Sequence, residues 1–259
     1  MRRVPILLYH SVDDDPRADV RRWSVEVRRF RDHMALLRGD GWETFTITSL
    51  LSALRHGETL PERSVAITFD DGFEDVLTAA LPTMDGMTAT VYATSGYLRG
   101  AEEPVAPPGR MLDARQLREL RDAGLEVGVH GHRHVALDAV SRSLARRDIR
   151  DSKARIEDAL GAATPSFAYP YGYHDRSVQA FVREVGFRNA VGVKNVHSHD
   201  RDDLWGIARI TIERDTTTAA LQQMLAEPDP PIAPDSDRLV TVGWRAVRRA
   251  RTLLAGHSA

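Results

Sequence analysis

The chain has 259 residues, of which 42% are hydrophobic and 28% are charged, a composition typical of a globular protein with a sizeable core. Its formal net charge of −2 gives no reason to expect a nucleic-acid partner, and the absence of cysteine excludes disulfides and thiolate ligands. Any metal must therefore be held by histidine, aspartate or glutamate.

The sequence has neither of the usual signals for membrane insertion or export. No apolar run approaches the roughly 18 residues that a transmembrane helix requires. The apolar segment before Tyr9 and His10 is also shorter than the roughly 7–15 residues of a secretory signal. We therefore expect a cytoplasmic protein.

Short apolar segments alternate along the chain with segments whose apolar residues recur at helical spacing. Strands are predicted at residues 4–9, 44–47, 64–69, 88–93, 125–129, 166–169, 188–193 and 207–212. Helices are predicted at residues 25–37, 50–55, 73–81, 114–123, 141–160, 177–185 and 217–226. The alternation predicts βα units with parallel strands and an α/β barrel over residues 1–226.

The last part of the chain differs in composition. Residues 227–237 contain four prolines and several acids, and we expect a linker there. Residues 238–259 could form a basic helix with one apolar face. The simpler interpretation is a docking or trailing helix, and the alternative is a weak contact with a membrane surface or a partner.

Two adjacent carboxylates, Asp70 and Asp71, follow the predicted strand at residues 64–69. The carboxyl ends of strands are where α/β barrels place their active sites. Gly72 would let the backbone curl, so that one carboxylate could bind a metal while the other stays free as a proton acceptor. The alternative is an ordinary Asp-Gly turn with a helix cap.

Three histidines, His130, His132 and His134, follow the predicted strand at residues 125–129. Residues four apart share one face of a helical turn, which would let His130 and His134 converge on one ion. Two histidines and a carboxylate are a common catalytic metal set. We expect His132, whose spacing differs, to line the cleft.

Two further strand ends carry polar groups. The predicted strand at residues 166–169 ends in a proline-containing turn at residues 170–172, whose backbone N–H groups or aromatic rings could face a substrate. His10 ends the first predicted strand. Taken alone, both features also suit ordinary turns and structural side chains.

Together these motifs resemble the polysaccharide deacetylases, the NodB-homology family or carbohydrate esterase family four. Residues 68–72 resemble the first motif, in which the first Asp (here Asp70) is the base and the second (Asp71) binds metal. His130 and His134 match the second motif, the metal-binding pair. Residues 167–172 resemble the third, whose tyrosine N–H, here that of Tyr171, helps to hold the oxyanion. The resemblance runs from about residue 6 to about residue 212.

The N-terminal Leu-Leu-Tyr-His is similar to a subgroup that includes poly-N-acetylglucosamine deacetylases, in which the acid histidine lies on the first strand. The resemblance implies that His10 is this acid. It also implies a distorted (β/α)7 barrel and one divalent metal, usually zinc, with cobalt, nickel or manganese as alternatives. The expected activity is N-deacetylation of an N-acetylated carbohydrate.

One position departs from the family pattern. Many members carry an arginine in the third motif that orients the base, and Ala168 stands there in this chain. Arg209 is a candidate substitute, and the alternative is a surface arginine at a strand edge. Two other functions remain open: hydrolysis of another C–N bond, as in a small amide or cyclic ureide, and an inactive carbohydrate-binding relative.

Overall fold

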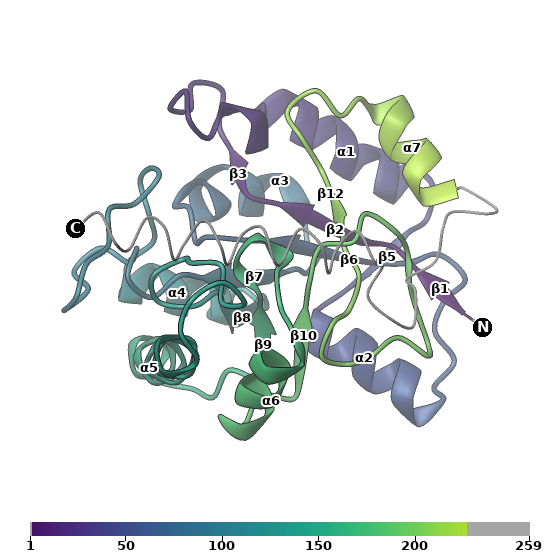
Figure 1. Ribbon diagram of the computed structural model, residues 1–259. Coiled ribbons are helices and arrows are strands. Elements are labelled where there is room, and N and C mark those ends of the chain that lie inside the picture. Colours follow the sequence, from purple (N-terminus) through teal and green to yellow (C-terminus); the bar gives the residue numbers. More distant parts are fainter. Residues whose placement is uncertain (1, 227–259) are drawn as a thin grey trace.

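The computed structural model describes residues 2–226, and the linker and basic helix predicted for residues 227–259 lie outside the described residues. A parallel sheet curls through the centre, with helices packed around its outside (Figure 1). The strands are β2 (Ile6–Tyr9), β5 (Glu43–Phe45), β6 (Ser64–Phe69), β7 (Thr90–Ala93), β8 (Glu126–Val129), β9 (Ser166–Ala168), β10 (Asn189–Val191) and β12 (Ile210–Thr211). Their order is β10-β9-β8-β7-β6-β2-β12, and β5 pairs with the first half of β6.

The two edges of the curled sheet approach each other. Edge strand β12 pairs with β2. The segment that leads into β12 contacts the opposite edge, because Ile207 forms a parallel bridge to Val191 of β10 and the Gly192 N–H donates to the Ile207 carbonyl at 2.8 Å. The predicted α/β fold, a distorted seven-unit barrel, is thereby confirmed.

Helices connect the strands on the outside of the curl (Figure 1). They are α1 (Val27–Gly39), α2 (Ile47–His56), α3 (Leu81–Met84), α4 (Ala114–Asp122), α5 (Arg142–Leu160), α6 (Arg176–Glu184) and α7 (Thr218–Ala226). Side-chain caps begin several of them, as where Asp113 and Gln116 form a reciprocal capping box at α4. Gly57 and Gly161 end α2 and α5 in the left-handed conformation that glycine adopts without strain.

Both faces of the central strands are buried, as parallel sheets require. In β6, Val65 and Ile67 belong to the large core between sheet and helices, whereas Ala66 belongs to a second apolar cluster. That second cluster also contains Tyr92 and residues of α2. The alternation follows from the two-residue period of a strand.

Several elements differ from the sequence prediction. The first strand divides at Pro5 into β1 (Arg3–Val4) and β2, and β1 pairs instead with β11 (Ser198–His199). Proline offers no N–H to continue a ladder. The helix predicted at residues 73–81 begins at Val76 as a π-helix (Val76–Ala80) and continues in α3 to Met84, whereas Phe73 forms a bridge to Met111. The short strands β3 (Ser11–Val12) and β4 (Ser24–Val25) were not predicted.

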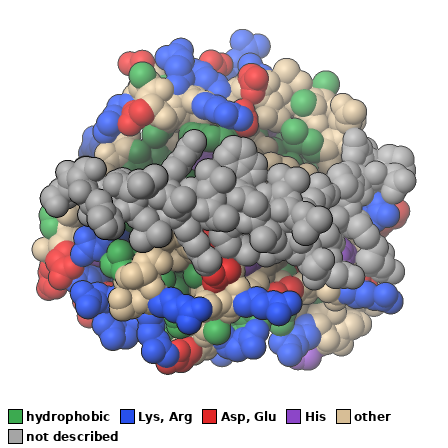
Figure 2. Space-filling model, viewed as in Figure 1, with side chains coloured by type: hydrophobic (Ala, Val, Ile, Leu, Met, Phe, Trp, Pro, Cys, Tyr) green, Lys and Arg blue, Asp and Glu red, His purple; other side chains and the backbone are tan. Residues whose placement is uncertain are grey.

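The distribution of charged side chains on the surface of the described part agrees with the small net charge. Acidic and basic side chains are interspersed on the face in Figure 2, in keeping with the small net charge. Within residues 2–226, no helix combines the length and apolar content needed to span a bilayer.

Candidate active site

The sequence-predicted residues gather at the carboxyl ends of neighbouring parallel strands. His10 follows β2, the two aspartates follow β6, the histidine turn follows β8, and Tyr171 follows β9. Since β9, β8, β7, β6 and β2 are consecutive in the sheet, these strand ends lie along one rim. This is the edge at which α/β barrels carry their active sites.

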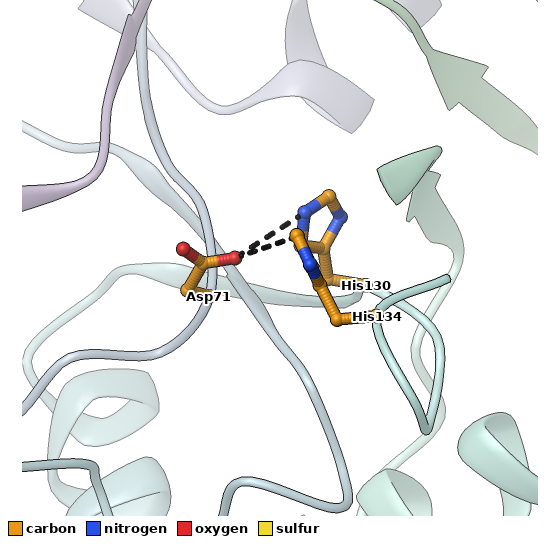
Figure 3. A group of neighbouring side chains, drawn as sticks. All are labelled: Asp71, His130 and His134. Atoms are coloured by element: carbon orange, nitrogen blue, oxygen red, sulfur yellow. Dashed lines mark ion pairs between the residues drawn. The ribbon is translucent and has the colours of Figure 1, made fainter. Parts of the chain in front are cut away.

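Asp71, His130 and His134 form the centre of the site (Figure 3). Asp71 Oδ1 lies 3.1 Å from His134 Nε2 and 3.5 Å from His130 Nε2. Ligands about 2.1 Å from a tetrahedral ion would be about 3.4 Å apart. Although Asp71 Oδ1 is buried, it makes no hydrogen bond of acceptable geometry within the described residues. Three converging ligand atoms with an unsatisfied buried oxygen among them fit one divalent metal.

The backbone explains how adjacent aspartates reach the same place. Asp71 and Gly72 both have positive φ, 73° and 89°, so the chain curls at once after β6. Asp70 Oδ2 lies 3.7 Å from His130 Nε2, the same nitrogen that Asp71 approaches. The two carboxylates therefore converge, whereas a continued strand would point them to opposite faces.

The histidines converge by a different route from the predicted one. Residues 130–134 form no helical turn, because Gly131 has φ 74° and His134 has φ 49°. The helical-turn prediction is therefore wrong, although His130 and His134 do meet, with ring centroids 5.0 Å apart. The His130 Nδ1 lies 2.9 Å from the Ala168 carbonyl, so Nδ1 carries the proton and Nε2 is left as an acceptor.

Electrostatics favour the metal-ligating forms of His130 and Asp71. Burial lowers the pKa of His130 to about 4, which keeps this ring neutral near pH 7. Burial opposes ionisation of Asp71, but the close contact with His134 outweighs it and lowers the pKa of this carboxyl. Burial also acts to lower the pKa of His134, but the contacts with Asp71 outweigh it and raise this pKa, so His134 must release a proton to bind a metal.

Asp70 is held by Arg209, which comes from the segment just before β12. Two parallel bonds of 2.7 Å join the guanidinium to the two oxygens of this carboxylate. Both side chains are buried, so the alternative of a surface arginine is wrong. Arg209 also donates to the Gly192 carbonyl and to Thr68 Oγ1. Burial would raise the pKa of Asp70, but the Arg209 charge outweighs it and the pKa is lowered.

His10 and Tyr171 lie beside this centre. The His10 ring is 5.5 Å from that of Trp23, and its Nδ1 is buried without a hydrogen-bond partner in the described part of the chain. His10 lies close enough to Asp70 and Asp71 to contribute to the lowering of both carboxyl pKa values. The Tyr171 ring is 55% exposed and packs edge-on against His134 at 4.6 Å. Tyr171 has φ 60°, a conformation uncommon outside glycine.

The structure places His132 differently from the prediction and adds two aspartates that sequence reasoning missed. His132 is buried, with its Nδ1 2.9 Å from Ser95 Oγ, rather than open to a cleft. Asp148 accepts from the histidine turn, and Asp75 accepts from Ser11 and Val12, directly after His10. Neither aspartate stands in a motif, and a polar residue inside a predicted helix gives no sign that its partner is distant in sequence.

Known proteins give an independent comparison. The family model described as "Polysaccharide deacetylase" matches residues 57–190. The polysaccharide deacetylase-like protein YxkH of Bacillus subtilis strain 168 is 22% identical over 212 residues, which are 81% of this chain and 71% of YxkH. The poly-β-1,6-N-acetyl-D-glucosamine N-deacetylase of Escherichia coli K12 is 37% identical over 76 residues, 29% of this chain but only 11% of that protein.

Solved structures share the fold. The Streptococcus pyogenes deacetylase PplD, solved in complex with acetate, superposes with a TM-score of 0.76 at 21% identity. The alignment covers 86% of this chain and 98% of that one. The family match spans more than half of the sequence and includes the aspartate pair, the histidine turn and the third motif. The chain therefore belongs to the polysaccharide deacetylase family.

Proposed function

We propose that this protein is a metal-dependent hydrolase that removes the acetyl group from an N-acetylated amino sugar or glycan. The observation that carries the proposal is the Asp70–Arg209 pair beside the group formed by Asp71, His130 and His134. It keeps a second carboxylate ionised next to the metal-ligand group, as a general base requires. The family assignment supports a carbohydrate as the substrate.

The chemistry of the three ligands favours one divalent metal. Two neutral imidazoles and one carboxylate, with positions left open, suit zinc, and cobalt, nickel or manganese are the alternatives. When bound, the metal would make a water molecule easier to deprotonate and would stabilise negative charge on the acetyl oxygen.

Asp70 acts as the base in this proposal. It takes the proton from the water that attacks the acetyl carbon, a role worth on the order of 10²–10⁴ in rate. Arg209 has two effects on this base: its charge keeps the carboxylate deprotonated, and its two hydrogen bonds fix the carboxylate plane.

His10 completes the proton transfers. When the C–N bond breaks, its electron pair goes to the nitrogen, which takes a proton from the His10 imidazolium and leaves as an amine. The oxygen of water ends in acetate. The Tyr171 N–H, in the turn beside His134, would donate to the acetyl oxygen as its charge develops.

One observation bears on the substrate, and the alternative functions are weighed against it. The Escherichia coli relative is named for acetyl removal from an N-acetylglucosamine polymer, and it supports an amino sugar here. Hydrolysis of a small amide or cyclic ureide is the second candidate function, since the same base and metal ligands could attack another C–N bond. An inactive binding relative is disfavoured by the intact pair of Asp70 and Arg209.

The test is acetate release from N-acetylglucosamine oligomers by zinc-loaded protein, with a cyclic ureide assayed in parallel. Asp70→Asn should lose at least about a hundredfold in kcat while zinc stoichiometry stays unchanged. Near-normal kcat would remove Asp70 from the proposed role. Ureide turnover without acetate release would favour the second function, and bound zinc without either activity would favour a binding relative.

A further inference from the structure

Asp148 is a buried carboxylate directed at the histidine turn. It lies in the first half of α5 with 3% of its surface exposed. Its two oxygens accept the backbone N–H groups of His132 at 2.8 Å and Arg133 at 3.0 Å. Among the described residues, these two backbone N–H groups are the hydrogen-bond partners of the Asp148 oxygens.

The turn needs such a partner because its own backbone is irregular. Between His130 and His134 the chain passes through two left-handed residues, Gly131 and His134, and the second is not glycine. A turn of this kind lacks the repeating hydrogen bonds of a helix, so its N–H groups must be satisfied from elsewhere. Asp148 satisfies the two that stand midway between the histidines.

Gly131 of the turn also packs closely against the Asp148 carboxylate. A Cβ added at Gly131 would lie 2.8 Å from Asp148 Oδ1, closer than real Cβ atoms come. Glycine at this position thus serves both the positive φ and the close approach of the carboxylate. Gly131 and Asp148 form one interlocking contact.

The two histidines depend on this contact to different degrees. His130 directly follows β8, and its ring is held by the Ala168 carbonyl. His134 lies beyond the turn, where its polar contact is with Asp71, its fellow ligand, and its ring packs against Tyr97 and Tyr171. The position of His134 relative to His130 is therefore set by the turn that Asp148 holds.

We propose that Asp148 is a positioning residue that fixes His134 at ligand distance from His130 and Asp71, and so sets the metal affinity of the site. The inference rests on the proposed function, since it requires that these three residues bind a metal. Groups that orient metal ligands typically change affinity by 10–100-fold when they are lost.

The experiment compares zinc dissociation constants of folded, metal-free protein, measured by competition with a chelating dye. Asp148→Asn keeps the size of the side chain, but its NH₂ group would face one of the two N–H donors. We expect zinc binding 10–100-fold weaker than in the wild type. Asp158→Asn, an exposed aspartate on the same helix, is the matched control and should leave the affinity unchanged.

Thermal unfolding of the metal-free variants separates positioning from simple support of the fold. A purely structural Asp148 would lower the melting temperature while the folded fraction bound zinc with wild-type affinity, and that result would overturn the proposal. If Asp148→Asn does not fold, Gly131→Ala perturbs the same contact from the other side and should also weaken zinc at least tenfold. Wild-type affinity in folded Gly131→Ala would count against the idea equally.

The wild-type protein separates this inference from the function on which it rests. A wild type without zinc binding would remove the proposed metal site and Asp148's role together. Zinc binding by the wild type with unchanged affinity in Asp148→Asn would remove the role of Asp148 alone.

Discussion

Replacing Arg209 by methionine removes the positive half of a buried ion pair while keeping most of the side-chain volume. The guanidinium is fully buried and makes two 2.7 Å bonds to Asp70, so the variant leaves that carboxylate without its counter-charge. Loss of one partner from such a pair typically costs about 3–5 kcal/mol. Much of that cost is the penalty of the uncompensated charge that remains.

A double-mutant cycle isolates this penalty. Asp70→Asn should also destabilise the protein, because it leaves the Arg209 charge buried. The double variant contains neither charge, and its loss of unfolding free energy should fall short of the summed single losses by at least about 2 kcal/mol.

The assay is urea unfolding of the metal-free proteins, followed by circular dichroism. Arg201→Met, which removes an exposed arginine, is the control and should change the unfolding free energy by less than about 0.5 kcal/mol. If the two single losses add to within about 0.5 kcal/mol, the reasoning on the pair is refuted.

Further predictions concern the groups around this pair. Burial raises the pKa of Asp75 from 3.8 to about 6. The protonated side chain therefore contributes fully to the free energy of unfolding below about pH 4, and this contribution is lost as pH rises through 6. The loss amounts to up to about 3 kcal/mol. Asp75→Asn should flatten this part of the pH dependence in urea titrations, and an unchanged slope would contradict the assignment. His10→Ala should reduce kcat more on amides than on matched esters, since an alkoxide leaves without a proton more readily than an amide anion; equal losses would argue against an acid role. His134→Ala should lose bound zinc by elemental analysis, and full occupancy would exclude it as a ligand.

Most of the fold could be predicted from local features of the sequence. Strand β6 was predicted at its observed bounds, because a short apolar run ending in two aspartates and a glycine has few other interpretations. Helices α4 and α5 were predicted within a residue or two, since capping residues and glycines mark their ends. The strand predicted at residues 4–9 is two strands in the structure, because Pro5 interrupts the ladder.

The sequence by itself determined which residue types stand at which strand ends, and therefore that Asp71, His130 and His134 are candidate ligands. Only the tertiary structure decided how they meet: through left-handed turns, and with Arg209 reaching Asp70 across 139 residues of sequence. The physical reason is that hydrophobic periodicity and capping act over a few residues and can be read locally. A buried charge, by contrast, takes its partner from whichever segment the closed sheet brings beside it, and no local pattern encodes that choice.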